Sequence, residues 1–230
     1  MNVSTAVPAP SSRPSPRSLR VRDKLMRTAE RLYAEHGFAG VSMRMIREAA
    51  GQRNNSAVQY HFSSRDELIV AILEQHAAAV ERHRSRLVSV LEERGEASPR
   101  EWIACVVEPG IEHHVELGTP SWYGRFLAQA VVDPGLREHA RRAYTCTPSF
   151  QRLDRLHPAA LPAAGAGRDA ELTERHAAMI RLLLVHMCAD LETELAAGEA
   201  TREEAERAWR RLGDNLVTAV LGLSSALLPG

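Results

Sequence analysis

The fold of this chain is decided by residues 42–62, which read SMRMIREAAGQRNNSAVQYHF. Ser42 is a suitable N-cap for a short helix over residues 43–50, and Gly51 is suited to end it. A further short helix is expected over residues 55–62, with Val58, His61 and Phe62 facing inward at i, i+3 and i+4 and a polar first turn. Two short helices joined by a tight turn are typical of the helix-turn-helix motif, whose second helix lies in the major groove of DNA.

The turn and the start of the second helix carry side chains that can recognise nucleic acid. Asn and Gln can pair with the edge of adenine, Ser can contact any base, and Arg can bind guanine or a phosphate. These candidates are Gln52, Arg53, Asn54, Asn55, Ser56 and Gln59. For so short a segment taken alone, a polar turn between two solvated helices stays an open alternative.

The charges of the chain are unevenly distributed. Its 230 residues hold 29 basic and 29 acidic side chains, so the formal net charge is zero. Residues 1–62 nevertheless hold ten Arg or Lys against four Asp or Glu, a net charge of +6, and the remainder holds 19 against 25, a net charge of −6. A basic end joined to an acidic body is expected where one end meets a polyanion.

The pattern divides the chain into three parts. Residues 1–18 are rich in Pro and Ser and are expected to form a disordered basic arm. Residues 19–66 are expected to form the DNA-binding domain, with its motif at about 43–62. Its first helix runs from Val21, with apolar positions at helical spacing, to a turn at Gly37. The third part, residues 67–230, is expected to form a helical domain.

The whole chain is predicted to be all-α, since no segment alternates convincingly like a strand. Apolar periodicity and helix starts predict body helices near residues 65–93, 99–117, 121–131, 135–156, 170–196 and 202–226. Three of these starts carry capping boxes, formed by Ser64 with Glu67, Ser98 with Glu101, and Thr201 with Glu204. Pro109-Gly110 is expected to kink or split its helix.

The segment AERLYAEHGFAGVSMRMIREAAGQRNNSAVQYHFSSRDELIVAIL resembles the N-terminal domain of the TetR family of bacterial transcriptional regulators. The likeness covers about residues 20–75. It rests on three features: the aromatic-x-x-x-Gly-aromatic pattern at the end of the first helix, Ala-Gly at the turn, and Tyr60-His61-Phe62 at the end of the motif. The resemblance implies phosphate contacts by Ser42, Arg44, Tyr60, His61 and Arg65, and base contacts by Asn54, Asn55, Ser56 and Gln59. For His61, a packed core histidine is an open alternative.

Two positions depart from the family pattern. Arg47 stands where a small residue is usual, so it is expected to extend outward or to reach a phosphate. Gln59 stands where Tyr is usual, so the phosphate contact of that Tyr would pass to Tyr60, or Gln59 would contact a base.

The resemblance also implies a C-terminal domain that holds a small-molecule inducer and forms a homodimer through its last two helices, at about residues 170–226. Both helices offer wide apolar faces, which could instead be ordinary core within one chain. Aromatic, thiol, thioether and imidazole side chains on amphipathic helices are candidates for the pocket, although such residues are also common in cores. They are Trp102, Cys105, His114, Trp122, Tyr123, Phe126, Met179 and His186.

The expected function is a ligand-responsive, sequence-specific DNA-binding regulator that represses a palindromic operator. The alternatives are a DNA-binding regulator whose C-terminal domain binds a protein partner, or a helical enzyme, for which we find no catalytic motif. No cofactor or metal is expected, because the adjacent His113 and His114 point about 100° apart on a helix. With no apolar run long enough to span a bilayer and no signal-peptide pattern, the chain is expected to be cytoplasmic.

Overall fold

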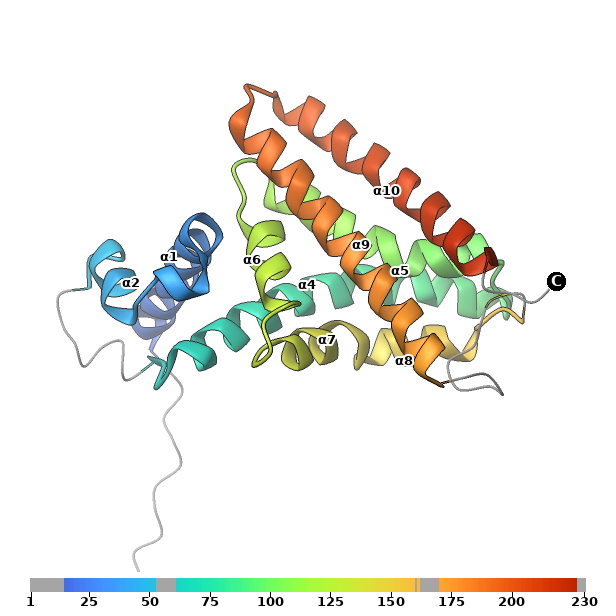
Figure 1. Cartoon of the computed structure of the whole chain (residues 1–230), viewed down its shortest axis with the longest axis horizontal. Coiled ribbons are helices and arrows are strands. Elements are labelled where there is room, and N and C mark those ends of the chain that lie inside the picture. Colours follow the sequence, from blue (N-terminus) through green and yellow to red (C-terminus); the bar gives the residue numbers. More distant parts are fainter. Residues whose placement is uncertain (1–14, 53–60, 160, 162–169, 227–230) are drawn as a thin grey trace, which may run out of the picture.

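The computed structural model describes residues 15–52, 61–159, 161 and 170–226, and for residues 170–173 the backbone alone. Within these residues every regular element is a helix, so the predicted all-α fold is confirmed (Figure 1). The helices are α1 (Pro16–Gly40), α2 (Met43–Ala49), α4 (Arg65–Arg94), α5 (Pro99–Leu117), α6 (Tyr123–Ala130), α7 (Arg137–Thr145), α8 (Pro148–Arg155), α9 (Ala170–Ala197) and α10 (Arg202–Ala226). Most of the predicted third helix, residues 55–62, lies outside the described residues.

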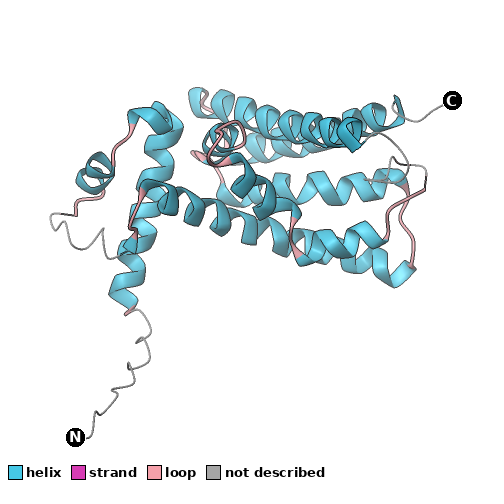
Figure 2. Cartoon of the chain, turned by 60° about the horizontal axis from the view of Figure 1, so that its bottom comes forward, coloured by secondary structure: helices cyan, strands magenta, loops and turns pink. Residues whose placement is uncertain are grey.

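Two groups of helices are visible. Helices α1 and α2 lie together at one end of the molecule, and we call them the head (Figure 1). The long helix α4 begins beside the head and continues into a body formed with α5 to α10. Figure 2 shows the same division after a turn of 60°, with the long body helices side by side. α6 packs against α1 on one side and against α9 on the other.

Helix α1 starts earlier than predicted. The hydroxyl of Ser15 accepts a hydrogen bond from the backbone N of Ser18 at 3.2 Å, and Pro16 occupies the first turn, where its missing N–H is not needed. The predicted disordered arm, residues 1–18, is therefore wrong at its last three positions, and its first 14 residues lie outside the described part. The predicted turn at Gly37 is present as a left-handed residue, with φ 77°, inside α1.

The core of the head continues into the body. Tyr33 and Phe38 of α1 meet edge to face, with ring centroids 5.1 Å apart. Phe38 in turn lies 5.6 Å from the ring of Phe126 on α6. Ile46 of α2 and Leu68 of α4 are fully buried in the same cluster. The head therefore shares one apolar core with α6 and with the first turns of α4.

Two of the three predicted capping boxes are complete in the structure. Those at Ser98 and Thr201 are complete, because each cap hydroxyl and the third-position Glu carboxylate exchange hydrogen bonds with each other's backbone N. At α4, Ser64 caps the backbone N of Glu67 at 3.1 Å, but the carboxylate of Glu67 accepts from Ser63 instead. Each of these caps nevertheless marks the observed start of its helix.

The predicted single helix over residues 135–156 is wrong. The structure has α7 and α8, separated at residues 146 and 147. Thr147 begins α8, because its hydroxyl accepts from the backbone N of Phe150 at 3.4 Å and Pro148 occupies the first turn. α5, in contrast, runs unbroken through Pro109, so the expected split does not occur.

Helix α6 begins two residues later than predicted, at Tyr123. The hydroxyl of Ser121, just before it, donates to the carboxylate of Glu192 on α9 at 2.6 Å and holds this segment outside the helix. None of the helices in the described part of the chain is both long and apolar enough to cross a membrane.

Candidate functional site

The start of α2 presents the predicted phosphate-contacting residues at the surface. The hydroxyl of Ser42 accepts from the backbone N of Met45 at 3.3 Å. Arg44 is exposed, and its Nε donates to Glu48 at 2.8 Å. This hydrogen bond raises the pKa of Arg44 and lowers that of Glu48. Arg47 is half-buried, as is typical of an arginine whose stem lies along a helix.

The predicted base-contacting residues Asn54, Asn55, Ser56 and Gln59 lie outside the described residues, as do Arg53 and the predicted phosphate contact Tyr60. His61 is half-buried, and burial together with the nearby charge of Arg22 lowers its pKa. Arg65 donates to the backbone oxygen of Phe38 at 3.4 Å and to the carboxylate of Asp66 at 3.2 Å. Arg65 therefore joins the start of α4 to the end of α1.

A row of basic residues on α1 adds to this surface. Arg17, Arg20 and Lys24 are exposed and follow one another at helical spacing. With Gln52 at the end of the α2 turn they surround an open hollow. Sequence analysis counted Arg17, Arg20 and Lys24 in the basic end of the chain but selected none of them as a DNA contact, and it assigned Arg17 to the disordered arm.

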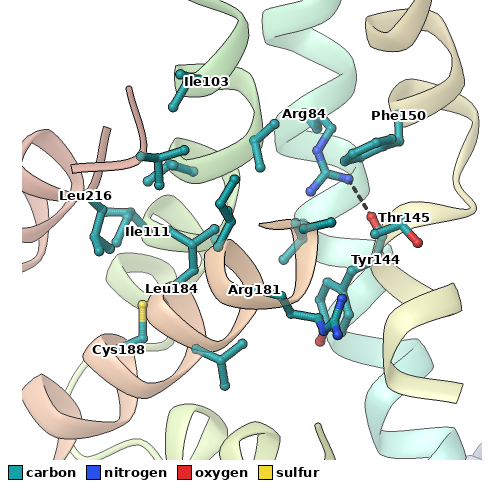
Figure 3. Close-up of a pocket in the computed structure, with 18 of the residues that line it drawn as sticks. Arg84, Ile103, Ile111, Tyr144, Thr145, Phe150, Arg181, Leu184, Cys188 and Leu216 are labelled. Atoms are coloured by element: carbon teal, nitrogen blue, oxygen red, sulfur yellow. Dashed lines mark hydrogen bonds between the residues drawn. The ribbon is translucent and has the colours of Figure 1, made fainter. Parts of the chain in front are cut away.

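The body contains a cavity of about 340 Å³. Its apolar wall comes mainly from α5, α9 and α10, with Ile103, Val107, Ile111, Leu184, Leu216 and Val220 (Figure 3). The opposite end is formed by α4, α7 and α8 and carries charged and polar groups. Arg84, Tyr144, Thr145 and Phe150 lie there, and Arg181 of α9 lines the cavity as well. The cavity is thus apolar at one end and basic at the other.

Arg84 is the most buried charge at the cavity, with 4% of its surface exposed. Its Nε donates to the backbone oxygen of Cys105 at 3.2 Å, and its Nη1 donates to that of Tyr144 at 3.1 Å. The guanidinium lies over the ring of Phe150, 5.2 Å from the centroid. Burial lowers the pKa of Arg84, while the carboxylate of Glu81 opposes that shift. No carboxylate of the described residues lies within ion-pair distance of it.

Two further arginines line the basic end. Arg141 is held by Glu138, with Nη2 2.6 Å from the carboxylate. Arg181 is half-buried, and burial together with the charge of Arg141 lowers its pKa. Tyr144 accepts a hydrogen bond from the hydroxyl of Tyr123 at 2.8 Å, and burial raises the pKa of both phenols.

Histidines connect the cavity with the head. His76 of α4 lies 2.8 Å from His113 of α5, nitrogen to nitrogen, and its other ring nitrogen lies 3.2 Å from the carboxylate of Glu30 on α1. The ring of His76 stacks on Tyr123, with centroids 4.2 Å apart. His114 lines the cavity, and burial lowers the pKa of His113 and of His114 to about 3. Both are therefore neutral in the folded protein.

Helix α6 is hydrogen-bonded to α9 and to α1. The Glu192 carboxylate of α9 accepts from the backbone N of Gly124 and of Arg125, each at 3.0 Å. At the other end, the Gln129 amide donates to the backbone oxygen of Tyr33 at 2.8 Å and accepts from the backbone N of Phe38 at 3.0 Å.

Comparison with known proteins identifies the head. A model of the bacterial regulatory proteins of the tetR family matches residues 25–72, which run from α1 into α4. The head and the start of α4 are therefore of the tetR type. Relatives of the chain include the HTH-type transcriptional repressor AcnR of Corynebacterium glutamicum, 31% identical over 74 residues, which cover 32% of this chain and 35% of that protein. AcnR of Corynebacterium diphtheriae is 26% identical over 132 residues, which cover 53% of this chain and 64% of that protein.

This chain spans less than two thirds of the length of the curated relatives it matches. A solved structure of a TetR-family transcriptional regulator from Mesorhizobium loti superposes with a TM-score of 0.47 at 17% identity. The superposition covers 91% of this chain and 98% of that one.

Of the eight residues predicted to line a pocket, the structure places Trp102, His114 and Tyr123 at the cavity. The other five, Cys105, Trp122, Phe126, Met179 and His186, do not line it. Cys105 and Phe126 are buried in neighbouring core clusters, and burial raises the pKa of the Cys105 thiol to about 11. Met179 and His186 are exposed on α9, because the face of that helix which meets the cavity is the one that carries Leu184.

The basic end of the cavity was missed by sequence analysis, although one signal was available. Arg84 falls in the apolar stripe of α4, at i+4 from Val80 and i−4 from Val88, both of which are buried. A charge within an apolar stripe faces the interior, and interior charges are uncommon without a function or a partner. Among the described residues, no group of three or more His, Cys, Asp or Glu side chains could hold a metal ion.

Proposed function

We propose that this chain is a sequence-specific, DNA-binding transcriptional regulator. It acts as a repressor that leaves a palindromic operator when a small-molecule inducer occupies the cavity. The observation that carries the proposal is the position of the family match: residues 25–72 run from α1 through α2 into the start of α4. The matched relatives are named as transcriptional repressors, which supports the same reading.

The proposed DNA interface is the exposed side of the head. Arg44 and Arg65 contact phosphates, and the segment of residues 53–59 supplies the base contacts. The basic row on α1, which begins at Arg17, extends the phosphate-binding surface beyond the motif. Because each phosphate contact releases counterions, affinity should fall steeply with salt concentration.

The proposed assembly is a homodimer through α9 and α10. Met179, Leu182 and Met187 of α9 are 44%, 37% and 38% exposed. At 100° per residue they fall within an arc of about 140° around the helix axis. An apolar face of this kind is stabilised when two copies of the helix pair form a four-helix interface. A two-fold dimer presents two heads to the two halves of a palindrome.

The proposed response to the inducer passes through α6. Tyr123, Gly124, Leu127 and Val131 line the cavity from this helix and its C-terminal end, so a ligand contacts α6 directly. The amide of Gln129 ties α6 to the backbone of α1. An inducer that favours a shifted α6 therefore favours a shifted head, and the population of the DNA-binding form falls.

The experiment that tests the proposal is selection of bound duplexes from a random DNA pool by the purified protein at near-physiological salt, followed by sequencing. We expect a pseudo-palindrome whose half-sites are one helical turn, about 34–36 Å, apart. An enriched sequence without two-fold symmetry would contradict the dimer. Enrichment of no sequence would contradict sequence-specific binding by the chain alone.

Two variants test the division of roles in the head. Asn55→Ala should change base preference at one position of the selected site, at a cost of roughly 1–3 kcal/mol. Arg44→Ala should weaken binding to all sequences and lower the salt slope by about one unit. Fluorescence anisotropy on the selected duplex, a mutated duplex and random DNA separates the two. A uniform loss from both variants would contradict the assignment.

A further inference from the structure

We infer that the cavity binds an organic anion, a carboxylic acid with an apolar chain or ring. Its carboxylate lies at the basic end, against Arg84 and with the charge of Arg181 nearby, and its apolar part lies along the wall from α5, α9 and α10. If the proposed function holds, this acid is the inducer. The binding of the acid to the cavity does not depend on the proposed function.

The first argument is the state of Arg84. A guanidinium carries five N–H donors. Among the described residues, Arg84 donates only two hydrogen bonds, to the backbone oxygens of Cys105 and Tyr144. Neutral carbonyls do not compensate the charge, and a buried cation without a counter-charge is costly. Arg84 lines the cavity, so a carboxylate placed there would supply both the missing acceptors and the missing negative charge.

The second argument is that the carboxylates near the basic end either bind other groups of the protein or lie at the rim of the cavity. Glu81, on the same helix as Arg84, accepts from the backbone N of Ser149 at 2.8 Å and also from its hydroxyl. Glu138 is bound by Arg141. Asp154, the acidic side chain that lines the cavity, is exposed at its rim. The positive charge inside the cavity is therefore not cancelled from within.

Arg181 provides a second cation at the cavity, and the charges of Glu174 and Glu138, which are not part of the cavity lining, act on it. Among the described residues it makes no hydrogen bond or ion pair within bonding distance. Arg181 lines the cavity together with Tyr144, whose backbone carbonyl accepts the hydrogen bond from Arg84 (Figure 3). The planar guanidinium of an arginine matches the two-oxygen geometry of a carboxylate.

The third argument is the contrast with the remaining wall. Ile103, Ile111 and Leu216 are almost completely enclosed in a second apolar cluster. A ligand with many polar groups, such as a nucleotide or a sugar phosphate, would leave those groups without partners against this wall. A cavity of about 340 Å³ lies within the usual range for small-molecule sites.

The test measures binding to the full-length protein without DNA, by titration calorimetry and thermal unfolding. The probes are two carboxylates, decanoate and 2-naphthoate, each paired with the neutral alcohol of the same skeleton, decan-1-ol and 2-naphthalenemethanol. We expect at least one carboxylate to bind roughly tenfold or more tightly than its alcohol, since a hydrogen bond to a charged group is stronger than a neutral one.

Three variants locate the carboxylate. Arg84→Gln should weaken the bound carboxylate roughly ten- to a hundredfold and leave the alcohol unchanged. Because Arg84 also binds two backbone carbonyls, this variant can lose stability, and Arg181→Gln provides the second test with an expected loss of about threefold to tenfold. Arg86→Gln is the matched control: Arg86 is exposed on the same helix and should leave the affinity unchanged.

The outcomes separate this inference from the proposed function. Equal binding of acid and alcohol, or no binding of either carboxylate, overturns the inference, while operator selection stands unaffected. Carboxylate binding that Arg181→Gln and Arg84→Gln leave unchanged also overturns it. Carboxylate binding that depends on these arginines supports the cavity chemistry, even if the same protein selects no DNA sequence, in which case the proposed function alone fails.

Discussion

His114 is buried in the body, with its ring stacked on Trp209 at a centroid distance of 4.2 Å. Its Nδ1 has no hydrogen-bond partner among the described residues. Burial, and then the neighbouring His113 and His76, lower its pKa to about 3. An unfolded histidine binds its proton near pH 6.5. Between about pH 6.5 and 3 the unfolded chain therefore binds more protons, and stability falls as the pH falls.

We predict that His114→Phe makes stability less dependent on pH, because Phe keeps an aromatic ring on Trp209 and removes the titrating group. In the unaltered protein His114 should lower stability by roughly 2 kcal/mol between pH 7.5 and 5. Urea unfolding at the two pH values measures the difference. His139→Gln, at an exposed histidine of α7, should leave the pH dependence unchanged. An equal pH dependence in the His114→Phe variant would show that the buried ring is not the source.

Gly124 of α6 packs tightly against the backbone of α9. A β-carbon there would lie 3.2 Å from the backbone oxygen of Cys188 and 3.2 Å from the Cα of Ala189. Backbone atoms cannot move aside as a side chain can, so we predict that Gly124→Ala destabilises the protein by about 1–3 kcal/mol. Gly110→Ala on α5 is the control, since nothing lies within 4 Å of its added carbon and it should be neutral or stabilising by up to about 1 kcal/mol. Urea unfolding curves that coincide for the two variants would contradict this packing argument.

At the scale of helices, the sequence predicted most elements because their starts are local. Ser98 and Thr201 mark the starts of α5 and α10 through contacts spanning three residues, which are visible in the sequence itself. The break between α7 and α8 was missed although Pro148 and the capping Thr147 are local signals too. The late start of α6 depends on Glu192, 71 residues from Ser121, and no local pattern contains that contact.

Helix α6 meets the head at the interruption of α1, where Gln129 bonds to the backbone oxygen of Tyr33 and the backbone N of Phe38. We predict that Gln129→Ala lowers stability by about 1–3 kcal/mol, because two partly buried backbone groups lose their partner. Gln151→Ala, at an exposed glutamine of α8, is the control and should stay within about 0.5 kcal/mol of the unaltered protein. A stability for Gln129→Ala as high as that of the control would contradict a link between α6 and α1 through this amide.

At the scale of the molecule, the position of the cavity could not be derived from the sequence. Its lining combines residues from α4 to α10, and Arg84 and Arg181 are almost one hundred positions apart. Composition places aromatic residues in the body but does not tell which of them reach the cavity: Phe126 and Tyr123 belong to one buried cluster, and of the two Tyr123 alone also lines the cavity. The basic head and the acidic body, in contrast, follow from counting charges along the chain.

The proposed dimer makes a prediction for the whole molecule. Leu182 lies among the exposed apolar side chains of α9, so Leu182→Lys should place charges in the centre of a four-helix interface and shift the protein from dimer to monomer at micromolar concentration. Val90→Lys on α4 is the control: Val90 is 57% exposed, away from α9 and α10, and the variant should remain dimeric. Sedimentation equilibrium measures both masses, and binding to the selected duplex should weaken only for Leu182→Lys, because one head contacts one half-site. A Leu182→Lys protein that stays dimeric would place the interface on another face of the body, and the exposed methionines of α9 would then need a different partner.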